Sequence, residues 1–129
     1  MIRNHDPNTI HAPLGHYTHA IEVPRDARLL FVSGQIGIKP DGTLAEGIEG
    51  QLRQIWENIS AILANANMTL DNIIRVRTFV TRPEHFTVHP RIRSEFLGAH
   101  RAAATGVCIG ALATPEILCE IEIEAASPG

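Results

Sequence analysis

The spacing of apolar side chains predicts a long amphipathic helix in the first half of the chain. Over residues 44–63 apolar side chains recur every three or four positions, which is the spacing of one helix face. The stripe consists of Leu44, Ile48, Leu52, Ile55, Ile59 and Leu63. Thr43 and Glu46 have the spacing of a capping box, so we expect the helix to begin beside them. The pattern ends near Asn65, where we expect the helix to end.

The remaining periodic segments predict a second helix and five strands. The helix is expected over residues 88–97, because Pro90 suits a first turn and Gly98 suits a helix end. Apolar, β-branched and alternating segments predict strands at residues 17–23, 28–33, 72–81, 105–112 and 117–126. The first two strands are separated by only four residues, a spacing that predicts a hairpin. Residues 1–13 have no periodicity and are expected to form an arm.

This order of elements predicts one α+β domain over residues 1–129, a mixed sheet with two helices packed on one face. Each helix has one apolar stripe to bury, and one face of the sheet can receive both stripes. The other face must then contact solvent or another subunit. The strand at residues 28–33 is apolar on both faces, so we expect it to be buried on both sides by self-association.

Composition and charge exclude several classes of protein. Hydrophobic residues at 44% and charged residues at 19% are typical of a globular domain rather than a disordered or fibrous chain. The formal net charge is -3 and no basic stripe is present, so nucleic acid is not an expected partner. The chain has no apolar run of about 18 residues and no signal-peptide pattern at its start, so we expect a cytoplasmic protein without a membrane partner. Cys108 and Cys119 fall in predicted strands and are expected to be buried free thiols.

Several motifs, in matching order, resemble those of the YjgF/RidA family. The similar segments are residues 15–20 (the family's G-P-Y-S-x-A), 31–37 (V-S-G-Q-I), 54–59 (Q-x-x-x-N-I/L), 73–79 (V-x-K-x-T-V-F) and 121–125 (I-E-I-E-A). The similarity extends from about residue 14 to residue 126. The resemblance implies a chorismate-mutase-like fold and a homotrimer with three clefts at its subunit interfaces. It implies a small-molecule substrate and no metal or organic cofactor.

The resemblance also implies a chemistry. Family members with the full site hydrolyse enamines and imines formed from amino acids, giving a 2-oxo acid and ammonia. An arginine holds the substrate carboxylate, a task that suits guanidinium geometry. A glutamate on the last strand positions the attacking water. By position, the family's tyrosine, serine and glutamate correspond to Tyr17, Ser33 and Glu122, whereas its arginine corresponds to Ala104.

Other positions of the expected cleft also differ from the family pattern. The proline before the tyrosine is His16, and an asparagine of the second helix is His89. We interpret both histidines as donors that replace the lost carboxylate contact. Thr105 follows Ala104 and is expected to line the same cleft. Arg101 lies three residues before Ala104 and is a candidate to reach into the cleft; the alternative is an exposed side chain after a helix end.

The carboxylates of the last strand also have a purely structural interpretation. Glu120, Glu122 and Glu124 alternate, so they share one face of the strand. Arg75 and Arg77 on a neighbouring strand can pair with them, and such exposed pairs contribute little to stability. A role in the cleft and a role in a polar sheet face therefore both stay open for Glu122.

The histidines and Ser33 suggest no metal site and no nucleophile. His16 and His19 are three residues apart in an extended segment, so they point to opposite faces and make a poor metal pair. No Ser-His-Asp arrangement can be identified around Ser33. We therefore expect no metal ligands and no covalent intermediate on serine.

These observations predict a Rid-type hydrolase that acts on a small enamine or imine at inter-subunit clefts, using Glu122 and an ordered water. Losing a charged bidentate contact costs about 2–4 kcal/mol, so Ala104 makes a free 2-imino acid a poor substrate. The alternative is a non-catalytic trimer that binds or senses a small metabolite in the same clefts. Ribonuclease activity has little physical support in a chain with one tryptophan, one tyrosine and no basic stripe.

Overall fold

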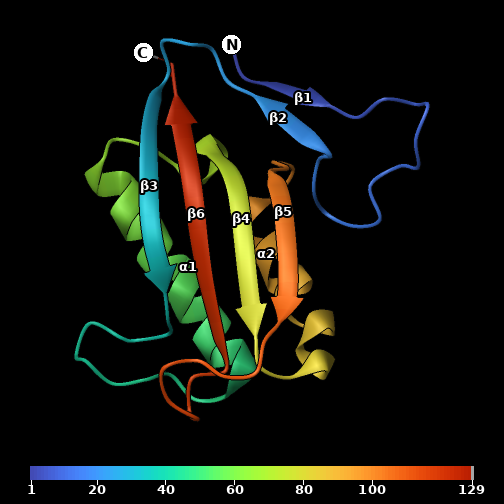
Figure 1. Ribbon diagram of the computed structural model, residues 1–129. Helices are drawn as coiled ribbons and strands as arrows, with labels where there is room; N and C mark the ends of the chain where they lie inside the picture. The colour runs from blue at the N-terminus through green and yellow to red at the C-terminus, as the bar shows by residue number, and fades with distance from the viewer. Residues whose placement is uncertain (129) are drawn as a thin grey trace.

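The computed structural model describes residues 1–128, in which four strands form a mixed sheet with both α-helices on one face (Figure 1). In chain order the elements are β1 (Arg3–His5), β2 (Ala20–Glu22), β3 (Arg28–Gln35), α1 (Gly47–Asn65), β4 (Ile73–Val80), α2 (His89–Leu97), β5 (Ala103–Cys108) and β6 (Cys119–Ser127). Short 3₁₀ turns, η1 (Leu70–Asn72) and η2 (Pro83–Thr87), precede β4 and α2. The predicted α+β class, with two helices on one side of the sheet, is confirmed. Within residues 1–128 neither helix combines the length and hydropathy needed to cross a membrane.

The sheet has the order β3-β6-β4-β5, so β6, the last strand in the sequence, lies second in the sheet. β6 runs antiparallel to both β3 and β4, whereas β4 and β5 run parallel. A parallel pair needs a crossover connection, and α2 supplies it. β5 is thereby placed at one edge of the four-stranded sheet, next to α2 (Figure 1).

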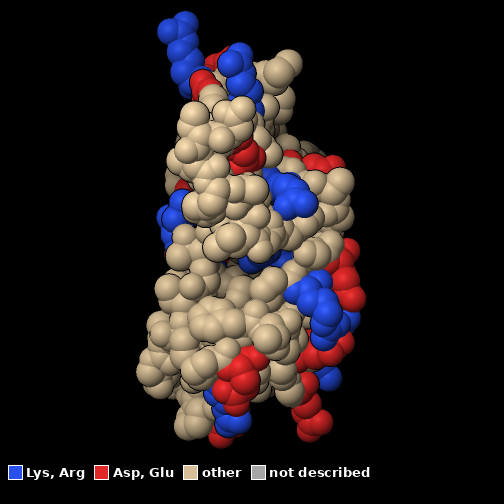
Figure 2. All heavy atoms as spheres, turned by 90° about the vertical axis from the view of Figure 1, so that its right-hand side faces the viewer, with Lys and Arg blue, Asp and Glu red and all other residues tan. Residues whose placement is uncertain are grey.

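The predicted hairpin between residues 17–23 and 28–33 is wrong. β2 pairs with β1, a strand inside the segment expected to be an irregular arm, and β3 pairs with β6. Pairing with β6 sets Val32 beside Ile123, both buried, which a local hairpin with β2 does not offer. The β1–β2 pair is attached to the edge of the main sheet by a bridge between Thr18 and Ala103. On this side of the molecule the surface is hollowed (Figure 2).

The beginning of α1 also differs from the prediction. The helix starts at Gly47, with Glu46 at the N-cap in an extended conformation and without a capping hydrogen bond from its side chain. Thr43 lies before the N-cap, in a turn where its backbone N–H and its hydroxyl both donate to Asp41, at 2.9 and 2.7 Å. Gly47 has a φ of 72°, a conformation that favours glycine. The turn before the helix therefore replaces the predicted capping box.

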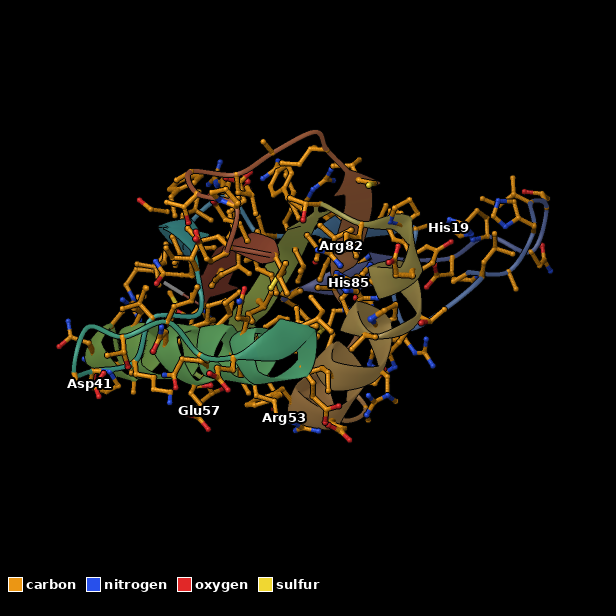
Figure 3. The ribbon with its side chains drawn as sticks, turned by 90° about the horizontal axis from the view of Figure 1, so that it is seen from below. His19, Asp41, Arg53, Glu57, Arg82 and His85 are labelled. Carbon is orange, nitrogen blue, oxygen red and sulfur yellow. The ribbon has the colours of Figure 1, made fainter. Side chains whose placement is uncertain are left out.

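The apolar stripe of α1 forms the centre of the core, as predicted. Leu52, Ile55, Ile59 and Leu63 are fully buried against the sheet. The opposite side of α1 carries charged side chains such as Arg53 and Glu57, which point away from the sheet (Figure 3).

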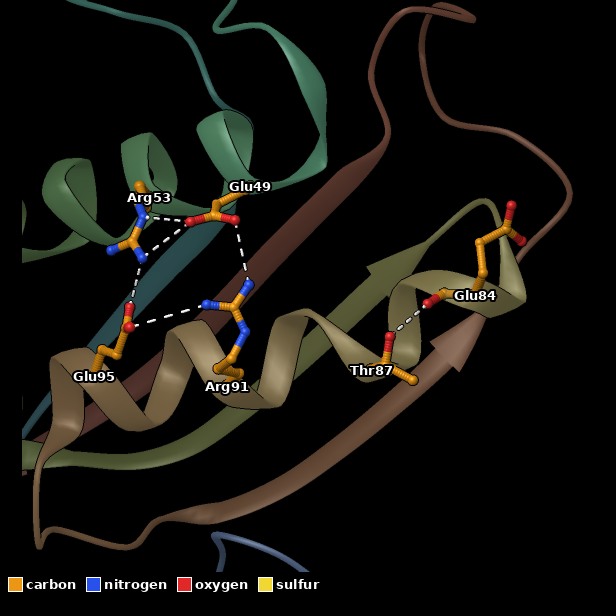
Figure 4. A network of polar contacts seen from close by, with 6 residues as sticks. All are labelled: Glu49, Arg53, Glu84, Thr87, Arg91 and Glu95. Atoms are coloured by element: carbon orange, nitrogen blue, oxygen red, sulfur yellow. Dashed lines mark hydrogen bonds and ion pairs between the residues drawn. The ribbon is translucent and has the colours of Figure 1, made fainter.

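A network of ion pairs on the solvent side joins α1 to α2 (Figure 4). Arg53 lies 3.2 Å from Glu49 and 2.7 Å from Glu95, and Arg91 lies 3.2 Å from Glu49. Pairs this exposed contribute little individually. Every exposed arginine of this network nevertheless has a carboxylate partner.

The sheet face opposite the helices is uncovered in the single chain. Leu29 and Phe31 of β3 are 53% and 71% exposed there, while Val32 faces the core. β3 thus has apolar side chains on both faces, but within the single chain only its core face is buried. Large exposed apolar side chains are typical of surfaces that other molecules cover. The predicted self-association through this face stays a prediction.

The two cysteines are free, as predicted, but only Cys119 is buried. Cys108 is exposed because it ends β5, the edge strand of the sheet. The prediction that both thiols are buried is therefore wrong for Cys108.

Candidate functional site

A row of polar side chains crosses the uncovered face of the sheet. In the strand register Glu122 of β6 lies beside Arg77 of β4, and Arg77 lies beside Thr105 of β5. On the other side of Glu122, β3 has a bulge that includes Ser33. The structure therefore brings three of the predicted site residues, Ser33, Glu122 and Thr105, onto one face within neighbouring strands.

Arg77 organises the carboxylates of this row. Its Nη1 donates to Oε1 of Glu124 at 2.8 Å and to Oε1 of Glu122 at 3.4 Å. The hydrogen bond to Glu124 is the main reason why the pKa of Arg77 is raised above its ordinary value. Because the contact to Glu122 is long, the Glu122 carboxylate keeps lone pairs for a water or a ligand. Arg75 contacts the row at its other end, where its Nη2 donates to the Thr105 hydroxyl at 3.3 Å.

A groove of about 650 Å³ lies on the other side of the sheet edge, between β5, α2 and the segment that precedes β2. It is lined by Leu14, Gly15, Tyr17, Phe86, His89, Pro90, Arg93, Ala104 and Gly106. Most of these side chains are apolar. Two nitrogen-containing side chains, those of His89 and Arg93, also line the groove, and each residue is only 6% exposed. Figure 2 shows a hollow in a largely uncharged surface on this side of the molecule, with basic side-chain atoms visible inside it.

His89 is a buried, neutral imidazole at the start of α2. Its ring packs edge-on against Phe86, with the ring centres 5.6 Å apart. It also lies against β5, where a Cβ at Gly106 would come within 3.3 Å of the ring. Burial, and then the charge of Arg93, lower the pKa of His89 to about 4. Its Nδ1 is buried and has no hydrogen-bond partner among residues 1–128.

The segment that forms one wall of the groove is held by two residues that were predicted to enter the cleft. Nε2 of His16 donates to the carbonyl oxygen of His100 at 2.9 Å. Nη1 of Arg101 donates to the carbonyl oxygen of Gly15 at 3.1 Å. Neither side chain is among the groove-lining residues. His16 and Arg101 therefore support the groove wall, while Tyr17, His89 and Ala104 line the groove.

The sheet separates the predicted site residues into two sets. Ala104 pairs with Val76 and faces the helices and the core. Glu122 pairs with Arg77 and faces the other way. The groove set (Tyr17, His89, Ala104) and the open-face set (Ser33, Glu122, Thr105) therefore lie on opposite sides of one sheet, and one chain cannot bring both to the same ligand.

Sequence reasoning missed Arg93, the one arginine of the groove. The side chain is buried because it lies one helical turn after His89, on the same face of α2. The spacing of four residues between His89 and Arg93 could have indicated this from the sequence, because a helix face that buries His89 also buries Arg93.

No metal site is evident in the part of the chain that the structure describes. Residues 1–128 contain no group of three His, Cys, Asp or Glu side chains arranged to hold a metal ion.

Comparison with known proteins places the chain among relatives of similar length. The family model described as Endoribonuclease L-PSP matches residues 9–127. A RutC family protein of Aquifex aeolicus is 35% identical over 113 residues, which cover 87% of each chain. A protein named putative reactive intermediate deaminase TdcF, from Escherichia coli, is 27% identical over 114 residues, which cover 87% of this chain and 85% of that protein. The crystal structure of YyfB from Yersinia pestis, described as a protein of unknown function in the conserved Rid protein family, has a TM-score of 0.87 at 29% identity and covers 98% of both chains.

Proposed function

This chain belongs to the YjgF/RidA family, whose model is described as Endoribonuclease L-PSP, and from that premise we propose that it hydrolyses the C=N bond of a small imine or enamine. The reaction takes place in clefts between the subunits of a homotrimer, and the nucleophile is a water held by Glu122. Membership of the family supports a role with small molecules in general. The similarity to a protein named a reactive intermediate deaminase supports the particular chemistry.

The observation that carries this proposal is the division of the site residues between two faces of the sheet. Glu122 and Ala104 lie on opposite faces, so a complete cleft needs the groove of one subunit and the open face of another. Leu29 and Phe31, exposed on the same face as Glu122, supply apolar surface for that contact. A site that is complete only on association explains why these side chains remain uncovered in the single chain.

Hydrolysis needs one proton acceptor and one water. An enamine first takes up a proton from solvent at carbon and becomes an iminium ion, the protonated form of an imine. Water then adds to the iminium carbon while Glu122 accepts one of its protons, which gives a neutral carbinolamine. Glu122 returns that proton to the nitrogen, ammonia leaves, and the hydroxyl group loses its proton to solvent to become a carbonyl group, so the enzyme ends the cycle unchanged.

The neighbours of Glu122 suit this task. Arg77 bonds mainly to Glu124 and only at 3.4 Å to Glu122, so it orients the Glu122 carboxylate without occupying all of its acceptor sites. Ser33 lies beside Glu122 at the bulge of β3, and its hydroxyl can contact the same water.

Ala104 shapes the choice of substrate. An alanine supplies no cation to the carboxylate that adjoins the C=N carbon of a 2-imino acid. The space that a long side chain would occupy is instead part of a groove with apolar walls. The preferred substrate therefore carries an apolar group larger than the methyl group of 2-iminopropanoate.

The test compares two imines formed in place from alanine and homophenylalanine by an amino acid oxidase. Semicarbazide traps free imine, so slower semicarbazone formation measures hydrolysis by the protein. We expect the phenyl-bearing imine to be hydrolysed faster, and Glu122→Gln to lower the rate by about 100-fold or more. Glu120→Gln, the same substitution two residues away on the same face, is the matched control and keeps activity. Full activity in Glu122→Gln, or no acceleration of either imine by the wild type, would refute the proposal.

A non-catalytic protein that binds or senses a small metabolite is the second candidate. The absence of a cation at position 104 favours it, because the family chemistry uses an arginine there. Such a protein binds its ligand without turnover at any pH, so the same assay separates the two functions.

An RNA substrate is not proposed, although the family description names an endoribonuclease. The open face of the sheet carries three glutamates, at positions 120, 122 and 124, against two arginines at positions 75 and 77. A surface with this balance offers phosphate groups no net attraction.

A further inference from the structure

Arg93 is a buried cation without a counter-ion in the part of the chain that the structure describes. Its side chain is 6% exposed, and Nη2 donates to the carbonyl oxygen of His16 at 3.3 Å. Nε is buried and has no hydrogen-bond partner, and no carboxylate of residues 1–128 lies within ion-pair distance of the guanidinium. Burial lowers the pKa of Arg93. A guanidinium has five N–H donors, so most of its binding capacity is unused.

The contrast with exposed arginines of the same region is informative. Arg91, two residues earlier on α2, pairs with Glu49 and Glu95 on the solvent side (Figure 4). Surface pairs of this kind are weak, whereas an unpaired buried charge is strongly unfavourable. Among the described residues, the buried cation of this helix therefore has no carboxylate partner, whereas the exposed one has two.

The surroundings of Arg93 describe what kind of anion fits. The groove walls are contributed mainly by Leu14, Tyr17, Phe86, Pro90 and Ala104, which are apolar or aromatic. His89, on the same helix face, is neutral at neutral pH, and its buried Nδ1 has no hydrogen-bond partner among the residues that the structure describes. One positive charge and one neutral imidazole match a single negative charge. A planar carboxylate can accept two parallel bonds from a guanidinium, while a doubly charged phosphate would remain half neutralised.

We propose that Arg93, on α2, binds the carboxylate of a small molecule whose apolar body fills the groove. Recognition of negative charge in this protein thus comes from the helix and not from position 104 on β5. His89 provides the second polar contact through a ring nitrogen. As a statement about the substrate, this inference rests on the proposed function: Arg93 then holds the anionic end of the substrate in the cleft where hydrolysis takes place.

The test uses phenylacetate and its uncharged counterpart phenylacetamide, which have the same shape. We expect isothermal titration of the full chain at neutral pH to show at least 10-fold tighter binding of phenylacetate. Arg93→Gln should weaken phenylacetate binding by about 10- to 100-fold and leave phenylacetamide unchanged, because only the charged contact is lost. Arg91→Gln, the same substitution on the exposed side of α2, should leave both affinities unchanged. Equal binding of the two probes, or a preference for phenylacetate that persists in Arg93→Gln, would overturn the proposal.

A second measurement does not depend on how the variant folds. In the wild-type protein, the Nε–H NMR signal of Arg93 should shift when phenylacetate is added and stay in place with phenylacetamide. An Arg93 Nε–H signal that does not shift when phenylacetate is added overturns the proposal. So does an Arg93→Gln variant with an altered oligomeric state in sedimentation, because the counter-ion is then a carboxylate of another subunit.

The design separates this inference from the hydrolase proposal. Glu122→Gln should keep the preference for phenylacetate while losing hydrolysis, because the two residues act on different groups of the ligand. Charge-selective binding without turnover in the wild type refutes only the hydrolase. Turnover without charge-selective binding refutes only the role of Arg93.

Discussion

The buried imidazole of His89 makes the stability of the protein depend on pH in a defined window. The ring is 6% exposed, and its pKa in the folded protein is about 4, against 6.5 for an unperturbed histidine. As the pH falls, the unfolded chain therefore takes up a proton at this position before the folded chain does. The stability contributed by neutral His89 is complete above about pH 6.5 and is lost as the pH falls toward 4.

The size of the effect follows from the two pKa values. A displacement from 6.5 to about 4 corresponds to about 3 kcal/mol once the pH is below both values. At pH 5 the unfolded chain is almost fully protonated at this residue and the folded chain is not, so about 2 kcal/mol is already lost. His89→Asn replaces the ring by an amide that does not titrate and should remove this loss.

The assay is urea unfolding at a fixed protein concentration between pH 8 and pH 4, for wild type and His89→Asn. Fixing the concentration matters because an oligomer gains stability by mass action. We expect the two stability curves to converge by about 2 kcal/mol between pH 8 and pH 5. His11→Asn, a substitution at an exposed ring, controls for the replacement itself. Parallel curves for wild type and His89→Asn would refute the argument that burial keeps this imidazole neutral.

Three other predictions concern packing and thiol chemistry. Gln51→Ala removes two hydrogen bonds of 2.9 Å to main-chain atoms just before β6 and should cost about 2–4 kcal/mol in urea unfolding; a loss below that range would mean that the loop finds other partners. Gly37→Ala adds a Cβ that would come 2.7 Å from the Cα of Gln51 and should lower the unfolding temperature; an unchanged temperature would contradict this close approach. A thiol reagent should modify Cys108 in the folded protein and Cys119 only after unfolding, since burial raises the pKa of Cys119 to about 12; a second fast-reacting thiol would contradict it.

Features that depend on neighbours along the chain could be predicted from the sequence. The stripe of α1 is a local property, because a period of 3.6 residues sets Leu52, Ile55 and Ile59 on one face whatever that face meets. The motifs that identify the family are likewise read along the chain. The alternation of Glu120, Glu122 and Glu124 correctly placed these carboxylates on one face of β6, opposite the core.

Features that depend on pairing between distant segments could not be predicted. Nothing near β3 indicates that its partner is β6, some 90 residues later, and so the local hairpin looked sufficient. Register matters in the same way, because a shift of one residue turns a side chain to the other face of a sheet. Ala104 and Thr105 are neighbours in sequence, yet one belongs to the groove and the other to the row with Glu122.

The sequence alone thus determined the class of fold, its two helices, most of its strands and the family, because periodicity and motifs are local. Only the tertiary structure decided that Glu122 and Ala104 lie on opposite faces, and that Arg93 is buried without a carboxylate partner among residues 1–128. A side chain's exposure, charge compensation and access to a ligand depend on what packs around it. For Arg93 that environment comes from α2, β5 and a segment more than 70 residues earlier in the chain.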